Sequence, residues 1–245
     1  MTEPTYNIPG VPVREAILEA HRSTWRRISQ PGGWFDGQTR VAIAAESRNA
    51  PSCTLCAERK AALSPYSIAG THDSLGSLPE EIVEVVHRII TDPARLREQW
   101  YEGILAGGMA DTEYVEIVGV VCSTVAVDTF ADTMGVPRPA LPTPESGEPS
   151  RRRPSGVKPG HAWVPWIAPE DASGPEADLY DGGTSNIRRA LMLVPDEQRG
   201  FFELVYAQYL SGSEITDFGT DCRAITRAQI ELIAGRVSAL NQCVY

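Results

Sequence analysis

The sequence has no excess of basic residues and no long apolar run, and its first residues lack the pattern of a signal peptide. Its 22 lysines and arginines are outnumbered by 32 aspartates and glutamates, giving a formal net charge of −10. Such a charge argues against a general nucleic-acid-binding protein, whose surface should be basic. No uninterrupted apolar run approaches the ~20 residues that span a bilayer, and the first five residues lack the basic and apolar regions of a signal peptide. We therefore expect a cytoplasmic protein without nucleic-acid or membrane partners.

Cysteine is scarce and its count is odd. The chain has Cys53, Cys56, Cys122, Cys222 and Cys243. An odd number in a reducing compartment argues against a structural disulfide framework. Cys122 falls on an apolar helix face and is interpreted as a buried structural thiol, and Cys222 lies in a polar loop and is interpreted as incidental.

Cys53 and Cys56 form a Cys-x-x-Cys unit, which indicates either redox chemistry or half of a zinc site. The zinc interpretation is weak because no second pair follows at metal-ligand spacing. The sequence therefore predicts no metal and no bound cofactor. Two histidines, His21 and His87, fall within predicted helices and are interpreted as packing or surface residues. The other two, His72 and His161, fall in loops and have no partner pattern.

Most readable segments have the apolar spacing of helices, and neither alternating strands nor a Gly-rich phosphate loop is present. The predicted fold class is all-α. The predicted helices cover about 17–28 and 39–48, and others start near 77, 92, 111, 186, 195 and 226.

Proline divides the chain into three parts. Ten of the nineteen prolines lie between 137 and 175, which is typical of an irregular connector. Trp163 and Trp166 suggest that part of this connector packs onto a domain surface. The predicted organisation is an N-terminal helical unit over 1–136, a connector over 137–183 and a C-terminal helical unit over 184–245.

The Cys-x-x-Cys unit follows a helix break. Pro51 is unfavourable for continuing the preceding helix, and Ser52 is a good N-cap. Cys53 and Cys56 would then lie in the first turn of a new helix, where free N–H groups and the helix dipole favour a thiolate. Such a pair is suited to cycling between dithiol and disulfide.

Glu231 and Cys243 form the second informative pattern. Twelve positions of straight helix would separate them by ~18 Å. A turn at Asn241 would let the chain fold back, so that Glu231 could accept a proton from the thiol.

The segments 226–234 and 238–245, TRAQIELIA and SALNQCVY, look very like the signature helix of AhpD-like alkylhydroperoxidases and carboxymuconolactone decarboxylases. The pattern of that family is Glu-x11-Cys-x2-Cys-x3-His on an all-α fold. The resemblance implies that Glu231 is a proton relay and Cys243 the first redox cysteine. The second cysteine and the histidine of the pattern would fall just past Tyr245. One branch of the family carries selenocysteine at that second position, so we hypothesise that the sequence ends at a selenocysteine codon read as a stop.

The segment 37–135 is also similar to an AhpD-like unit, with Cys53 and Cys56 as its redox pair. It departs from the family pattern at Val41, which stands in place of the glutamate, and at Lys60, which stands in place of the histidine. Glu46 is the nearby candidate for a replacement acid/base.

The resemblance implies a thiol- or selenol-dependent peroxidase that reduces alkyl hydroperoxides, is reset by a cellular dithiol reductant, and forms a homo-oligomer. We expect the site at Cys243 to be weakly active or inactive in this chain, because its second redox atom and histidine are missing. Two alternatives stay open: a non-catalytic helical scaffold with a regulatory Cys53–Cys56 disulfide, and a carboxymuconolactone decarboxylase-like enzyme.

Overall fold

The computed structural model describes residues 4–6, 8, 10–160, 162–181, 183–241 and 243. His161, Val244 and Tyr245, which were named above, lie outside them. Helices dominate the described residues, so the all-α class is confirmed at that coarse level. The α-helices are α1 (Glu15–Ser29), α2 (Gly37–Asn49), α3 (Thr54–Ala61), α4 (Glu80–Thr91), α5 (Glu98–Ala106), α6 (Asp111–Thr133), α7 (Asn186–Arg189), α8 (Pro195–Gln208), α9 (Gly212–Thr216) and α10 (Arg227–Leu240).

Shorter elements join these helices. The sequence pattern predicts no strand, but two short strands, β1 (Val157–Lys158) and β2 (Trp166–Ile167), pair antiparallel in the connector. Five 3-10 turns complete the described secondary structure: η1 (Ala50–Ser52), η2 (Pro65–Ser67), η3 (Pro93–Arg95), η4 (Pro169–Asp171) and η5 (Gly174–Tyr180).

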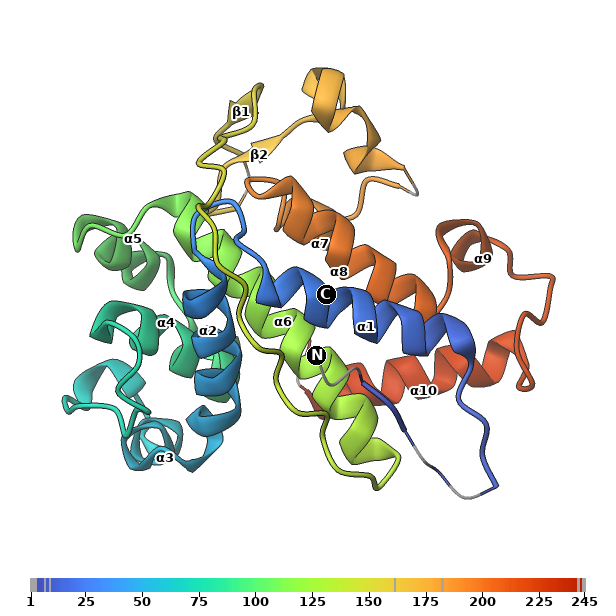
Figure 1. Cartoon of the computed structure of the whole chain (residues 1–245), viewed down its shortest axis with the longest axis horizontal. Coiled ribbons are helices and arrows are strands. Elements are labelled where there is room, and N and C mark those ends of the chain that lie inside the picture. The colour runs from blue at the N-terminus through green and yellow to red at the C-terminus, as the bar shows by residue number, and fades with distance from the viewer. Residues whose placement is uncertain are drawn as a thin grey trace.

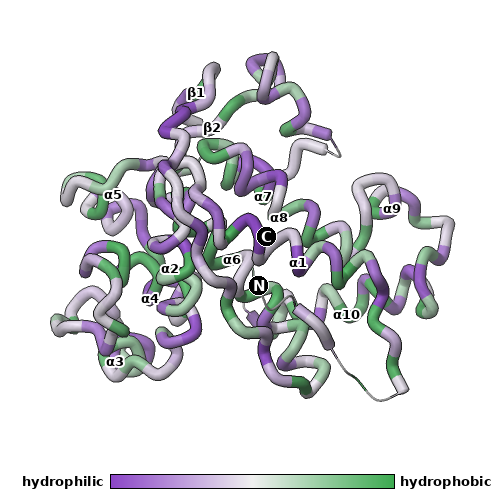
Figure 2. Tube along the Cα trace, viewed as in Figure 1, coloured by the Kyte–Doolittle hydropathy of each residue, from purple (hydrophilic) through white to green (hydrophobic). Residues whose placement is uncertain are grey.

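Helix α6 runs through the middle of the molecule (Figure 1). Helices α2 and α4 pack on it from one side, and α8, which also packs along α1, contacts it from another. The most hydrophobic stretches gather along α6 and its neighbours (Figure 2). By length and composition α6 could cross a bilayer, although Glu116 and Asp128 interrupt its apolar run. Since 67% of its apolar window is buried inside the protein, it is typical of a core helix.

The main hydrophobic core includes residues from both ends of the chain. Ile43 of α2 and Ile117 of α6 belong to the same buried cluster as Leu193 and Leu204, which lie just before and within α8. The C-terminal segment therefore completes a core that begins in the N-terminal segment. The division into two related units over 1–136 and 184–245 stays a prediction.

A buried charge network crosses this core. The guanidinium of Arg40 on α2 is almost fully enclosed and binds the carboxylates of Glu116 on α6 and Glu197 on α8, the latter at 2.7 Å. Arg27 of α1 also binds Glu197. Gly119 leaves room for Glu197, because a Cβ there would lie 2.6 Å from a carboxylate oxygen. Four helices are thus joined through opposite charges that offset one another's desolvation.

Only some of the helices begin at the positions that the sequence predicts. Thr226 caps α10 through its side chain, as the sequence predicts. Ser77 does not cap α4, which begins at Glu80 after an extended Pro79. The helix predicted to start near 92 is present with a later start: Pro93–Arg95 forms a 3-10 turn, and the α-helix α5 begins at Glu98.

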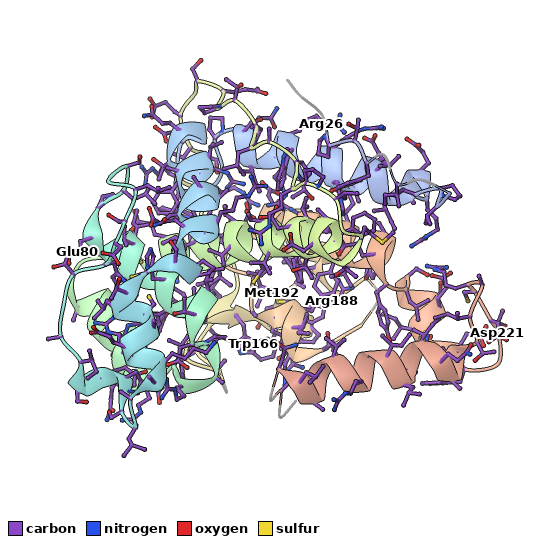
Figure 3. The ribbon with its side chains drawn as sticks, turned by 90° about the horizontal axis from the view of Figure 1, so that it is seen from below. Arg26, Glu80, Trp166, Arg188, Met192 and Asp221 are labelled. Carbon is purple, nitrogen blue, oxygen red and sulfur yellow. The ribbon has the colours of Figure 1, made fainter. Side chains whose placement is uncertain are left out.

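The proline-rich connector lies against the helical body. The indole of Trp25 donates to the carbonyl of Ala140, and Arg151 N donates to the carbonyl of Gly33. The Arg189 guanidinium lies 4.5 Å from the Trp166 ring centroid, which supports the predicted anchoring of the connector. Near Trp166, Met192 is part of a separate small buried cluster (Figure 3).

Candidate functional site

The Cys-x-x-Cys unit opens helix α3. Cys53 is the N-cap residue and Cys56 is the third helical residue, so the predicted first-turn location is confirmed. Ser52 does not act as the cap, because it belongs to the preceding 3-10 turn. The carboxylate of Asp73 accepts from Thr54 N at 2.7 Å in its place. A loop residue nineteen positions away in sequence therefore caps this helix start.

Two histidines meet the two thiols. His72 Nδ1 lies 3.5 Å from both Cys53 Sγ and Cys56 Sγ, and His87 Nδ1 lies 3.4 Å from Cys56 Sγ. One donor atom from each of the four side chains lies within 4.8 Å of the other three. All four residues are buried. We refer to Cys53, Cys56, His72 and His87 as the Cys2His2 cluster.

Carboxylates hold both imidazoles from behind. His72 Nε2 lies 2.7 Å from Glu84 Oε2, and His87 Nε2 lies 2.8 Å from Glu46 Oε1. Arg59 also binds Glu84, at 2.7 Å. Because each Nε2 is bound to a carboxylate, each Nδ1 is left to face the sulfurs.

The electrostatics of the cluster favour a thiolate beside imidazolium. Burial by itself would raise the pKa of Cys56, but hydrogen bonds with His72 and His87 outweigh it and lower that pKa to about 6. Burial would lower the pKa of His72, yet hydrogen bonds with Cys56 and Glu84 raise it to about 10. Burial would raise the pKa of Glu84, but hydrogen bonds from His72 and Arg59 outweigh burial and lower that pKa to about 2. The arrangement is thus an alternating chain of negative and positive groups.

The interpretation of His72 as a loop residue without a partner and of His87 as a packing or surface residue is wrong, since both rings contact the thiols. His72 lies in the loop after α3, and its meeting with the thiols depends on the path of that loop. His87 carried a usable signal, since it falls four residues after Val83 on the buried stripe of α4. Glu46 does lie at the site, but His87 stands between it and the sulfur of Cys56.

The second predicted pair is not brought together. Glu231 lies in the second turn of α10, where its carboxylate accepts from Tyr209 Oη at 2.8 Å and binds Arg227 at 2.7 Å. The helix continues for nine residues to Leu240, a rise of ~14 Å, before Cys243 follows. Glu231 is also far from the other thiol pair, because α10 and the helix α3 that carries Cys56 are well apart in both views (Figures 1 and 3). A proton relay from Glu231 to Cys243 stays a prediction.

Two kinds of chemistry fit the Cys2His2 cluster. A thiolate next to an oriented imidazole is the arrangement of an activated nucleophile. Two sulfurs and two imidazole nitrogens are also a donor set that Zn²⁺ prefers.

Comparison of the chain with family models, with curated proteins and with solved structures found no match. The AhpD-like resemblance therefore rests on the sequence motifs alone.

Proposed function

We propose that the protein is a thiol-dependent oxidoreductase that reduces hydroperoxides at Cys53 and Cys56. One observation carries this proposal: Cys56 Sγ lies within 3.5 Å of two imidazole nitrogens, and a carboxylate orients each imidazole. A thiol active site needs a nucleophile hydrogen-bonded to a base, and a third group hydrogen-bonded to that base to orient it. Cys56, His87 and Glu46 are linked in this order. Cys56 contacts two imidazoles through its sulfur and is assigned as the attacking thiol.

The reaction balances with one peroxide and two thiols. The Cys56 thiolate attacks one peroxide oxygen, the O–O bond breaks, and the alcohol leaves with a proton from an imidazolium. Cys56 becomes a sulfenic acid, and the Cys53 thiol displaces water from it to form a disulfide. A cellular dithiol reductant then restores both thiols by exchange and is itself oxidised to a disulfide.

Access to the thiols is narrow. Cys53 is 1% exposed and Cys56 is 4% exposed, whereas Arg59 and Glu84, which bind each other beside His72, are partly exposed. The proposed route for a small peroxide lies past these two side chains, with the loop over 62–79 moving aside. Slow entry of peroxide to these enclosed thiols would limit turnover, so a second candidate is a helical scaffold in which Cys53 and Cys56 form a regulatory disulfide without turnover.

Peroxide consumption by the reduced, chelator-treated full chain tests the proposal. We expect turnover with a dithiol reductant in the wild type, loss of turnover in Cys56→Ser, and a stalled sulfenic acid in Cys53→Ser. Cys122→Ser and Cys222→Ser are the matched controls, because neither thiol belongs to the cluster. Undiminished turnover in the Cys53→Ser/Cys56→Ser double variant would contradict the proposal. Stoichiometric loss of two thiols without turnover would favour the regulatory disulfide.

The finer parts of the proposal rest on the family resemblance. They are an AhpD-like fold with two related units, a second thiol site at Cys243, a cytoplasmic location and a homo-oligomer. The apolar surface of α10 supports self-association, because several large side chains there are exposed: Leu232, Ile233, Val237 and Leu240. Light scattering of the purified chain tests this, and a monomer at micromolar concentration would count against it.

A further inference from the structure

We propose that the Cys2His2 cluster binds one Zn²⁺ ion when its thiols are reduced. The ligands would be both sulfurs and the Nδ1 atoms of both histidines, with no coordination position left for substrate. The proposal is independent of the peroxidase activity. It concerns a closed structural site that the Cys-x-x-Cys spacing alone did not predict.

The spacing of the donor atoms matches a tetrahedral metal site. With Zn–S bonds of about 2.3 Å and Zn–N bonds of about 2.0 Å, a regular tetrahedron has S···N edges of about 3.5 Å. The three S···N distances of the cluster are 3.5, 3.5 and 3.4 Å. The three remaining edges are no longer than 4.8 Å.

Hydrogen bonding accounts for these positions less well. His72 Nδ1 is equally far from two sulfurs, so at most one of the two contacts can be a near-linear hydrogen bond. His87 Nδ1 faces the same sulfur of Cys56 from another helix. A central cation requires donor atoms that converge on one point. The four donor atoms of the cluster do so from the start of α3, the loop after α3 and helix α4.

The surroundings of the ligands also fit a zinc site. Both histidines have a carboxylate on Nε2, which is the second-shell arrangement that orients imidazole for a metal. Asp73 N donates to Cys53 Sγ at 3.4 Å, so a backbone amide lies on the ligand sulfur. The cluster is nearly closed to water, since its most exposed member, His72, is only 7% exposed.

This part of the fold has only a small apolar core of its own. Its buried apolar cluster consists of Cys53, Leu55 and Cys56, with Ile68 packed against them, and is separate from the main core. The loop over 62–79 contains one 3-10 turn, η2, as its regular structure. Small regions with insufficient core are commonly stabilised by a metal or a disulfide. A metal here would tie the loop to α3 and α4.

Metal and disulfide would exclude each other at this site. One hydroperoxide and two protons convert the two bound thiolates into a disulfide, an alcohol and water, and Zn²⁺ is released. This clause alone rests on the proposed function. Metal loading would then slow the reaction of the thiols with peroxide, because each thiolate lone pair that attacks peroxide is engaged by Zn²⁺.

Metal analysis of the full chain tests the site without any peroxide. We expect the reduced wild type to bind one Zn²⁺ per chain. Co²⁺ in its place should give visible bands of a tetrahedral ion and a near-ultraviolet thiolate-to-cobalt band. Cys56→Ser should lose the thiolate contribution, and Glu84→Gln should weaken binding by about 10- to 100-fold. Glu58→Gln, on the exposed side of α3, is the matched control.

Wild-type protein alone can overturn the proposal, so a variant that fails to fold does not obscure the result. Reduced protein that binds less than a tenth of an equivalent of Zn²⁺ or Co²⁺, or a Co²⁺ spectrum that is octahedral and lacks the thiolate band, would reject the site. Peroxide turnover of the chelated protein is measured separately. Either activity can therefore fail without the other.

Discussion

His87 Nε2 lies 2.8 Å from Glu46 Oε1, and both side chains are essentially fully enclosed. The same carboxylate accepts from Asn49 Nδ2 at 2.9 Å and from Leu75 N at 3.0 Å. One buried glutamate therefore joins the end of α2, the loop before α4 and the imidazole that faces Cys56. It connects the Cys2His2 cluster to the main helical body.

Removing this carboxylate should destabilise the protein strongly. We expect Glu46→Ala to lower the free energy of unfolding by about 3–5 kcal/mol, because it leaves His87 without its buried partner. Glu46→Gln should cost less, since the amide oxygen still accepts. Urea denaturation of metal-free, reduced protein measures both, with Glu58→Ala as the exposed control. A Glu46→Ala variant as stable as the control would contradict the assignment.

The buried network around Arg40 makes a second prediction. Arg40→Ala leaves the carboxylates of Glu116 and Glu197 enclosed without this cation, so we expect a loss of about 3–5 kcal/mol. Arg26→Ala removes an exposed pair with Glu19 and should cost less than about 1 kcal/mol. Equal losses for the two variants in urea denaturation would show that the buried network carries no special weight.

The shared core predicts cooperative unfolding. Leu204 of α8 is 1% exposed and Leu232 of α10 is 74% exposed. Leu204→Ala should cost about 2–5 kcal/mol, whereas Leu232→Ala should change stability by less than about 0.5 kcal/mol. Far-ultraviolet dichroism and tryptophan fluorescence should follow one transition for Leu204→Ala. A separate early transition, with the remaining helices unaffected, would indicate that α8 belongs to an independent unit.

His21 should make stability depend on pH. Burial lowers its pKa to about 4 from an ordinary value near 6.5, and its ring is bound by Tyr6 and Gln208. The neutral ring is favoured in the folded state, so its contribution is complete above about pH 6.5 and is lost as the pH falls towards 4. The loss should be on the order of 1–3 kcal/mol.

Comparison with His21→Gln isolates this effect from the other groups that titrate in the same pH range. The stability difference between wild type and variant should shrink as the pH is lowered from about 7 to about 4.5. A difference that stays constant over that range would mean that His21 titrates normally.

The elements that could be predicted from the sequence are those with a local cause. The apolar spacing of α1, α4 and α6 is a property of neighbouring residues, and Thr226 caps α10 from the position next to its first residue. Pro51 ends α2 for a local steric reason. Ser77 and Asp92 do not begin α-helices, since α4 starts at Glu80 and α5 starts at Glu98 after a 3-10 turn.

The site could be predicted only in part for the same reason. Cys53 and Cys56 are three residues apart, so one helical turn brings them together whatever the rest of the fold does. His72 and His87 are sixteen and thirty-one residues from Cys56. Their meeting depends on how the loop over 62–79 returns and how α4 packs beside α3, neither of which has a local periodic signal.

By itself, the sequence determined the helical class, the acidic surface charge and a thiol pair at a helix start, because composition and short-range spacing control these. Only the tertiary structure decided that the thiols face two imidazoles, that Glu46 and Glu84 hold those rings, and that α8 completes the core of α6. The physical reason is that burial and opposite charge act between whichever groups the packed helices bring together, regardless of their separation along the chain.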